Sequence, residues 1–337
     1  MGFFRFLLAI SVLSIHTDYN LGLSRFGEQL AVNAFFIISG FYMALIIAEK
    51  YTGKNGSYRL FITNRFLRIY PLYWVVLLAT IIFSTGLNPF RLPYTSVFKF
   101  ISDITLLART DYFSVNAAVS NTPLVTPAWT LIIELTFYLF ATFFVRLKTR
   151  YLLGIAVLSF AIKYGIAYYQ MLHHIYPKTG FFPACLVFFM LGIIAYRLYA
   201  RLKMKRIDKR LIISFFVVMV LLTLFYYQVP AFIRYHNFQL KEWLYYVLFT
   251  TFIPFGFTLL KSNPVDGFIG ELSYPIYISH YLIVGILGSF LKISANTWQL
   301  FLIASAVTII ISLVLVLLID KPVDRYRQKR LAVVKVP

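Results

Sequence analysis

Long apolar runs separated by short polar segments cover this chain from end to end. Ten of these runs approach the roughly 20 residues that a helix needs to cross the hydrocarbon core of a bilayer. Their approximate bounds are 3–20, 30–48, 69–86, 128–146, 151–169, 180–198, 211–229, 243–260, 271–290 and 298–319. Since an open strand cannot span lipid, the pattern predicts an all-α integral membrane protein with about ten transmembrane helices.

The longest connection between the apolar runs extends over residues 87–127. A connection of this length is uncommon in a compact domain unless it carries function. Apolar residues recur within it at helical spacing, at Val97, Ile101, Ile104 and Leu107 or Ala108. This spacing predicts an amphipathic helix that either lies at the membrane interface or re-enters the membrane, and the sequence leaves both alternatives open.

Composition agrees with the membrane assignment. Of 337 residues, 60% are hydrophobic and only 13% are charged, and the mean hydropathy is +0.78. Such values lie far from those of a soluble domain. No polar stretch is long enough to form a soluble extracytoplasmic domain, so residues 1–337 are interpreted as one transmembrane domain. The single cysteine, Cys185, excludes an internal disulfide, and no metal site is predicted.

Positive charge is unevenly distributed between the two sides of the predicted bundle. The chain has 32 Lys and Arg against 12 Asp and Glu, and most of the basic residues fall on alternate connections. The positive-inside rule places those connections in the cytoplasm, so both termini are predicted to be cytoplasmic. Because topology accounts for the excess of positive charge, no nucleic-acid partner is expected. The first run lacks a small-x-small cleavage pattern and is interpreted as a mature helix.

The first apolar run contains two ionisable residues, Arg5 and His16. On an α-helix they are separated by about 1100° of rotation, close to three full turns, and by about 16 Å of rise, so both side chains face the same direction. An ionisable group facing lipid at membrane depth would cost about 2.5–3.5 kcal/mol, which favours a functional polar interior. The alternative is that both side chains snorkel to opposite membrane surfaces.

Two further motifs place polar groups near or inside the bundle. Arg65 and Arg68 are three residues apart, so on a helix they share a face and could bind one polyanion together; ordinary topology charge is the alternative. Pro71 fits a helix start or a kink there. Glu134 lies within the fourth run and requires a basic or hydrogen-bonding partner, for which a purely structural ion pair is the alternative explanation.

Weaker signals occur at three other places. Asn33 is an amide inside the second run, His280 lies on an aromatic stretch, where a core hydrogen bond is more common than a catalytic role. His173, His174 and His236 fall in outer connections and receive no role.

Taken together, these motifs resemble the membrane acyltransferase family 3, the multispan O-acyltransferases that modify bacterial cell-surface glycans. The elements that carry the resemblance are Arg5 with His16, Ser39–Gly40–Phe41, Arg65-x-x-Arg68 with Tyr70–Pro71, Trp129 with Glu134, Phe137 and Tyr138, Ser273–Tyr274 with Ile276–Tyr277 and His280, and the closing Asp320–Lys321–Pro322. Two positions depart from the family pattern. Asn33 stands where an acidic residue is frequent, and Asp320 stands where glutamate is usual.

The resemblance implies a multi-pass enzyme of the bacterial inner membrane that transfers an acyl group, acetyl by family preference, from cytoplasmic acyl-CoA to a hydroxyl of a cell-surface or lipid-linked glycan. Acetyl-CoA is then a donor substrate, no bound cofactor is expected, and the other partners are the saccharide acceptor and membrane lipids. The implied donor-binding residues are Arg5, Arg65 and Arg68, the implied catalytic residues are His16 as general base and Glu134 as its orienting group, and the implied acceptor or lumen-lining residues are Asn33, Trp129, Tyr138 and His280. In a variant of this mechanism, His16 itself accepts the acyl group.

Two other classes of function remain open from the sequence. A transporter or flippase of a lipid-linked sugar also needs a polar interior and a charged mouth, but it does not consume acyl-CoA. A non-catalytic membrane scaffold would leave the depth of Arg5, His16 and Glu134 unexplained.

Overall fold

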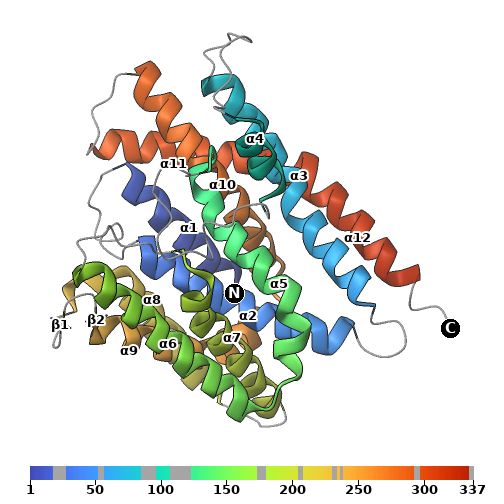
Figure 1. Ribbon diagram of the computed structural model, residues 1–337, viewed down its shortest axis with the longest axis vertical. Helices are drawn as coiled ribbons and strands as arrows, with labels where there is room; N and C mark the ends of the chain where they lie inside the picture. The colour runs from blue at the N-terminus through green and yellow to red at the C-terminus, as the bar shows by residue number, and fades with distance from the viewer. Residues whose placement is uncertain are drawn as a thin grey trace.

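The computed structural model describes residues 1–17, 28–51, 57–84, 96–106, 123–172, 180–203, 208–229, 234–235, 238–291 and 297–333. Long helices dominate it (Figure 1). The helices are α1 (Gly2–His16), α2 (Glu28–Lys50), α3 (Tyr58–Ser84), α4 (Val97–Thr105), α5 (Trp129–Arg146), α6 (Thr149–Leu172), α7 (Phe182–Leu202), α8 (Lys209–Leu224), α9 (Leu240–Leu260), α10 (Pro264–Leu291), α11 (Trp298–Leu315) and α12 (Lys321–Val333). The short elements are the 3₁₀ turns η4 (Thr126–Ala128) and η5 (Tyr226–Gln228), the π turn η6 (Val316–Asp320), and the antiparallel strands β1 (Arg234–Tyr235) and β2 (Phe238–Gln239).

The helical architecture predicted from the sequence is confirmed, with one small correction. Strands β1 and β2 form a hairpin in which Arg234 pairs with Gln239, an element that the prediction of an all-α protein omitted. Within the described ranges, eight helical segments are long and apolar enough to cross a membrane. The predicted runs 3–20 and 211–229 form α1 and α8, which have 15 and 16 residues. The count of ten spans and the cytoplasmic termini therefore stay predictions.

Helix α3 begins earlier than the apolar pattern indicated. It starts at Tyr58 rather than near residue 69, because its first three turns are polar and escape a search for apolar runs. Arg65 and Arg68 consequently lie inside the helix and share a face, and Pro71 lies within the helix rather than at its start. Helix α12 runs along the outside of this first half of α3 (Figure 1).

Helices α2 and α7 pack closely at the centre of the bundle. A Cβ atom at Gly40 would lie 2.3 Å from the Phe189 carbonyl oxygen, and one at Gly192 would lie 2.1 Å from the Ile37 carbonyl oxygen. Only glycine allows this approach, so Gly40 has the packing role that the sequence predicted. The contact holds α2 at the centre of the fold, with Ser39 near its midpoint.

Helix α1 lies beside α10 and runs in the same direction. The side chain of Asp266 in α10 accepts the backbone N–H groups of Gly2 and Phe3, each at 2.8 Å. This carboxylate therefore caps the start of α1, where negative charge is favourable. A Cβ atom at Gly270 would lie 2.7 Å from the Cα atom of Gly2, so the two backbones are in close contact. These contacts set the height of every residue on α1, including Arg5 and His16.

Helix α4 confirms the amphipathic helix predicted after residue 96; Leu107, Ala108 and most of the connection 87–127 lie outside the described residues. The end of α4 is bound to the middle of α3. The side chain of Tyr73 donates to the Asp103 carbonyl oxygen at 2.5 Å and that of Trp74 to the Ile104 carbonyl oxygen at 3.1 Å. Since α4 runs back along an apolar helix, the re-entrant alternative is favoured over one that lies flat at the interface.

Candidate active site

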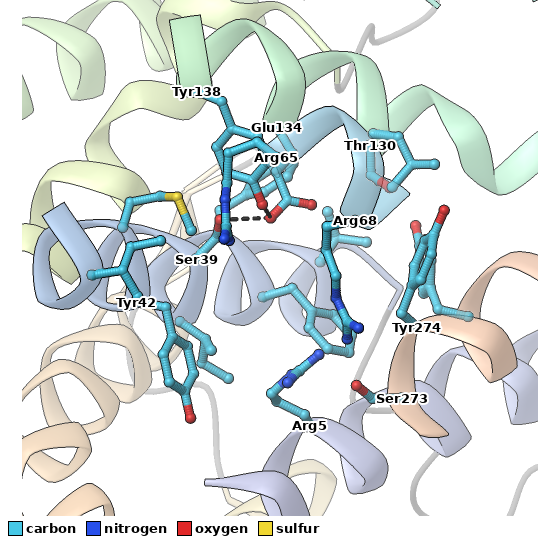
Figure 2. A pocket seen from close by; sticks show the side chains of 18 residues that line it. Arg5, Ser39, Tyr42, Arg65, Arg68, Thr130, Glu134, Tyr138, Ser273 and Tyr274 are labelled. Carbon is cyan, nitrogen blue, oxygen red and sulfur yellow. Dashed lines mark hydrogen bonds between the residues drawn. The ribbon is translucent and has the colours of Figure 1, made fainter. Parts of the chain in front are cut away.

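A pocket of about 260 Å³ lies between α1, α2, α3, α5 and α10. Figure 2 shows its polar side chains converging from these helices. We call it the arginine pocket, and its polar lining includes Arg5, Ser39, Arg65, Arg68, Glu134, Tyr138, Tyr274 and Tyr277. The fold thus brings together five of the site residues that the sequence singled out, from four helices: Arg5, Arg65, Arg68, Glu134 and Tyr138.

Three guanidinium groups give the arginine pocket its charge. Arg5 from α1 and Arg68 from α3 point toward one another (Figure 2). Arg68 lies 3.6 Å from the buried carboxylate of Asp320, whereas neither Arg5 nor Arg65 forms an ion pair within the part of the chain that the structure describes. Glu134 supplies a carboxylate to the lining. A surplus of guanidinium groups that lack carboxylate partners suits a bound polyanion such as a phosphate ester.

The carboxylate of Glu134 is held by two hydroxyl groups. Its Oε1 atom accepts hydrogen bonds from Ser39 at 2.6 Å and from Tyr138 at 2.5 Å. The partners are therefore hydrogen-bond donors rather than a structural ion pair, and two charge-assisted bonds fix the carboxylate at the pocket wall. The sequence interpretation of Ser39 as a packing residue was wrong, because its hydroxyl group lines the pocket.

His16 lies outside the arginine pocket, at the opposite end of α1 from Arg5. Its ring centroid is 5.0 Å from that of His280 and 5.2 Å from that of Tyr281, which it meets edge to face. We call His16 and His280 the histidine pair. His280 is fully buried, and its Nδ1 atom lies 2.7 Å from the Tyr277 carbonyl oxygen. The expected core hydrogen bond of His280 is thus present, but its contact with His16 was not foreseen.

A second cavity, of about 320 Å³, lies on the other side of the histidine pair. We call it the outer groove; it runs between the end of α3, the residues before α5 and the second half of α10, and hydroxyl groups of Thr80, Ser84 and Tyr281 contribute to its lining. Tyr277 lines the arginine pocket and has its ring 6.0 Å from that of His280. Since Tyr281 of the outer groove contacts His16, the histidine pair lies between the two cavities.

Sequence comparison identifies the chemistry of this fold. The sequence model of a family described as "Acyltransferase domain" matches residues 1–317. The chain belongs to this acyltransferase family. A curated relative in Acidianus two-tailed virus, named "Putative acetyltransferase ORF330", is 29% identical over 243 residues, which cover 69% of this chain and 68% of the relative. No solved structure matches the chain.

Three of the predicted acceptor or lumen-lining residues of this acyltransferase lie off the wall of the arginine pocket. Asn33 is buried, and its amide donates to the Tyr246 hydroxyl at 2.8 Å. Trp129 is the first residue of α5, and His280 belongs to the histidine pair. Tyr138 is the member of this predicted set that does line the pocket. A role for any of the four in acceptor binding stays a prediction.

The sequence interpretation missed the contribution of α12 to the donor side of the acyltransferase. Arg330 donates to the side chains of Asn64 and Thr63, beside Arg65 on α3. These basic residues follow the last apolar run and were interpreted only as topology charge. Their helical register could have indicated an interface with α3. Among the described residues, no cluster of three His, Cys, Asp or Glu side chains could hold a metal ion.

Proposed function

We propose that this membrane acyltransferase moves an acyl group, specifically acetyl, from cytoplasmic acyl-CoA to a hydroxyl of a cell-surface or lipid-linked glycan on the opposite side of a bacterial inner membrane. The observation that carries the proposal is the order of the three features along α1 and α10. The arginine pocket comes first, the histidine pair follows, and the outer groove lies beyond it. Donor binding, acyl transfer and acceptor binding then each have a separate place.

The arginine pocket is the proposed donor site. Coenzyme A carries phosphate groups, and Arg5, Arg65 and Arg68 present guanidinium groups that bind phosphate through charge-assisted hydrogen bonds. The thin pantetheine arm extends from these phosphates along the face of α1. Because Arg5 and His16 are about 16 Å apart along the helix axis, the arm delivers the thioester toward His16.

His16 is the proposed general base. It takes the proton from the acceptor hydroxyl as the hydroxyl oxygen attacks the thioester carbonyl carbon. The carbon–sulfur bond then breaks, and the coenzyme A thiolate leaves and receives the proton from the imidazolium of His16. The products are an acyl ester and coenzyme A, and the enzyme returns to its starting state. Histidine suits this cycle because it gains and loses a proton near neutral pH.

The outer groove is the proposed acceptor side. Thr80, Ser84 and Tyr281 supply hydroxyl groups for a saccharide, while the surrounding side chains are largely apolar. Its position next to His16, through Tyr281, supports delivery of an acceptor hydroxyl to the base. The transporter alternative also uses a path of this kind, but it releases no coenzyme A.

The test uses purified protein in lipid nanodiscs supplied with acetyl-CoA and a glycan fraction from the producing cells. Wild-type protein is expected to release coenzyme A and acetylate the glycan, with the product identified by mass spectrometry. His16→Ala should lower both by at least about 100-fold, the scale of general-base catalysis. Equal coenzyme A release by His16→Ala, with the variant folded by circular dichroism, would contradict the proposal.

A further inference from the structure

The tautomer of His280 is set by the backbone of its own helix. Its Nδ1 atom lies 2.7 Å from the Tyr277 carbonyl oxygen and 3.3 Å from that of Ile276. A carbonyl oxygen only accepts hydrogen bonds, so Nδ1 carries the proton. In the neutral ring, Nε2 is then an unprotonated acceptor with a free lone pair.

This acceptor is buried and unsatisfied in the part of the chain that the structure describes. The His280 side chain is fully buried, and Nε2 has no hydrogen-bond partner. Since Nδ1 faces the backbone of α10, Nε2 is directed away from that helix, and α1 packs alongside α10 with the ring of His16 5.0 Å away. Buried acceptors of this kind are rare enough to require an explanation, such as a partner engaged only during turnover.

We infer that His280 is the positioning residue of His16: its Nε2 atom accepts a hydrogen bond from one ring nitrogen of His16, which orients the other toward the acceptor hydroxyl. The inference rests on the proposed function, because it assigns His16 as the base. When His16 gains the proton of the acceptor, the same bond stabilises the imidazolium. His280 itself gains and loses no proton, so the transfer remains balanced as described above.

This arrangement performs with an imidazole the task that a carboxylate performs in many hydrolases. A neutral acceptor costs less to bury in an apolar bundle than a carboxylate does. Glu134, the carboxylate that the sequence suggested for this task, is bonded instead to Ser39 and Tyr138 in the arginine pocket.

The surroundings of the histidine pair carry little charge. Tyr277 and Tyr281 of α10 contact the pair, and phenols are neutral near pH 7. Helix α11, which packs on α1 and α10, has no ionisable side chain between Trp298 and Leu315. Helix α2 also packs on α1, and its Tyr42 lines the arginine pocket. His280 is therefore the neighbour best placed to set the protonation of His16.

Two variants of His280 separate positioning from packing. His280→Phe keeps an aromatic ring but removes Nε2, whereas His280→Gln keeps a hydrogen-bond acceptor of similar reach. We expect His280→Phe to lower kcat by 10- to 100-fold, on the scale of general-base effects, with unchanged affinity for acetyl-CoA. His280→Gln should recover part of that loss. Wild-type kcat in His280→Phe would overturn the inference.

A second measurement does not depend on acyl transfer. Diethyl pyrocarbonate reacts with neutral imidazole, so the rate of His16 labelling against pH, measured by mass spectrometry, reports its protonation. In His280→Phe the labelling profile should shift to lower pH, because the imidazolium has lost its acceptor. A profile identical to wild type would overturn the inference, whereas an active His16→Ala enzyme would overturn the proposed function separately.

Discussion

The arginine pocket and the histidine pair occupy opposite ends of α1 and differ in almost every physical respect. The pocket holds three guanidinium groups around a hydrogen-bonded carboxylate, whereas the histidine pair has only tyrosine phenols as described polar ring neighbours. Positive charge at fixed positions suits binding of a polyanion. Imidazoles in a weakly polar setting suit proton transfer. The contrast teaches that affinity for the donor and chemistry on it reside in different places.

The two regions are nevertheless connected through the same helices. Helix α1 carries Arg5 at one end and His16 at the other, and α10 carries Tyr274 and His280 in the same order. Variants confined to one region should therefore change one property, whereas a variant that displaces α1 should change both.

The largest effect on donor binding is expected from Arg65→Ala combined with Arg68→Ala. Each charge-assisted hydrogen bond contributes about 1.5–3 kcal/mol, so the double variant should weaken acetyl-CoA binding by about 10²- to 10⁴-fold. Isothermal titration calorimetry in nanodiscs measures this affinity. Arg59→Ala is the matched control, because Arg59 is exposed on the same helix and lies outside the pocket. An equal loss in the control would reduce the pair to ordinary topology charge.

Asp266→Ala should affect both regions. It removes the cap of α1, whose loss costs about 0.5–2 kcal/mol for helix caps in general. Thermal unfolding followed by circular dichroism should show the lower stability, and both acetyl-CoA affinity and kcat should fall. Asp266→Asn keeps an acceptor oxygen and should lie closer to wild type. A change in only one of the two properties would contradict the shared positioning of Arg5 and His16 by α1.

Glu134→Gln tests which region the carboxylate serves. The substitution removes a negative charge near the proposed phosphate site, so acetyl-CoA should bind more tightly by about 5-fold, equivalent to about 1 kcal/mol of Coulomb repulsion in a water-like medium. The pH profile of kcat should stay the same, which a pH series of steady-state assays measures. A shifted profile would instead support the prediction that Glu134 orients the imidazolium of His16.

The smallest effect is expected from Ser39→Ala. Glu134 loses one of its two donors but keeps Tyr138, and a hydrogen bond of this kind contributes about 1 kcal/mol. Acetyl-CoA affinity should change by no more than about 5-fold, with kcat unchanged. Thr136→Ala is the control, since its hydroxyl bonds to the Ile132 carbonyl oxygen of the same helix. An unfolded Ser39→Ala protein would return Ser39 to a packing role.

Features local to one helix were predictable from the sequence. The helical periodicity of Arg65 with Arg68, and of Glu134 with Tyr138, fixes a shared face without reference to any other helix. The helix around Val97 was equally readable from its apolar spacing. The start of α3 was missed because hydropathy reports lipid contact, and a helix continues where its residues are polar.

Contacts between distant segments were not predictable. His16 and His280 meet because Asp266 caps α1 and Gly270 allows the two backbones to approach, and neither contact leaves a pattern in one sequence. The same reason applies to Ser39. Its neighbour Gly40 has the packing role that small residues usually have, while the hydroxyl reaches a carboxylate on another helix.

The most direct test measures acetyl-CoA binding and acyl transfer on one preparation of His16→Ala. If the arginine pocket binds the donor and the histidine pair performs the chemistry, the variant should bind acetyl-CoA with wild-type affinity while transfer falls by at least about 100-fold. Transfer at the wild-type rate, or a loss of binding equal to the loss of transfer, would contradict the division of labour between the two ends of α1.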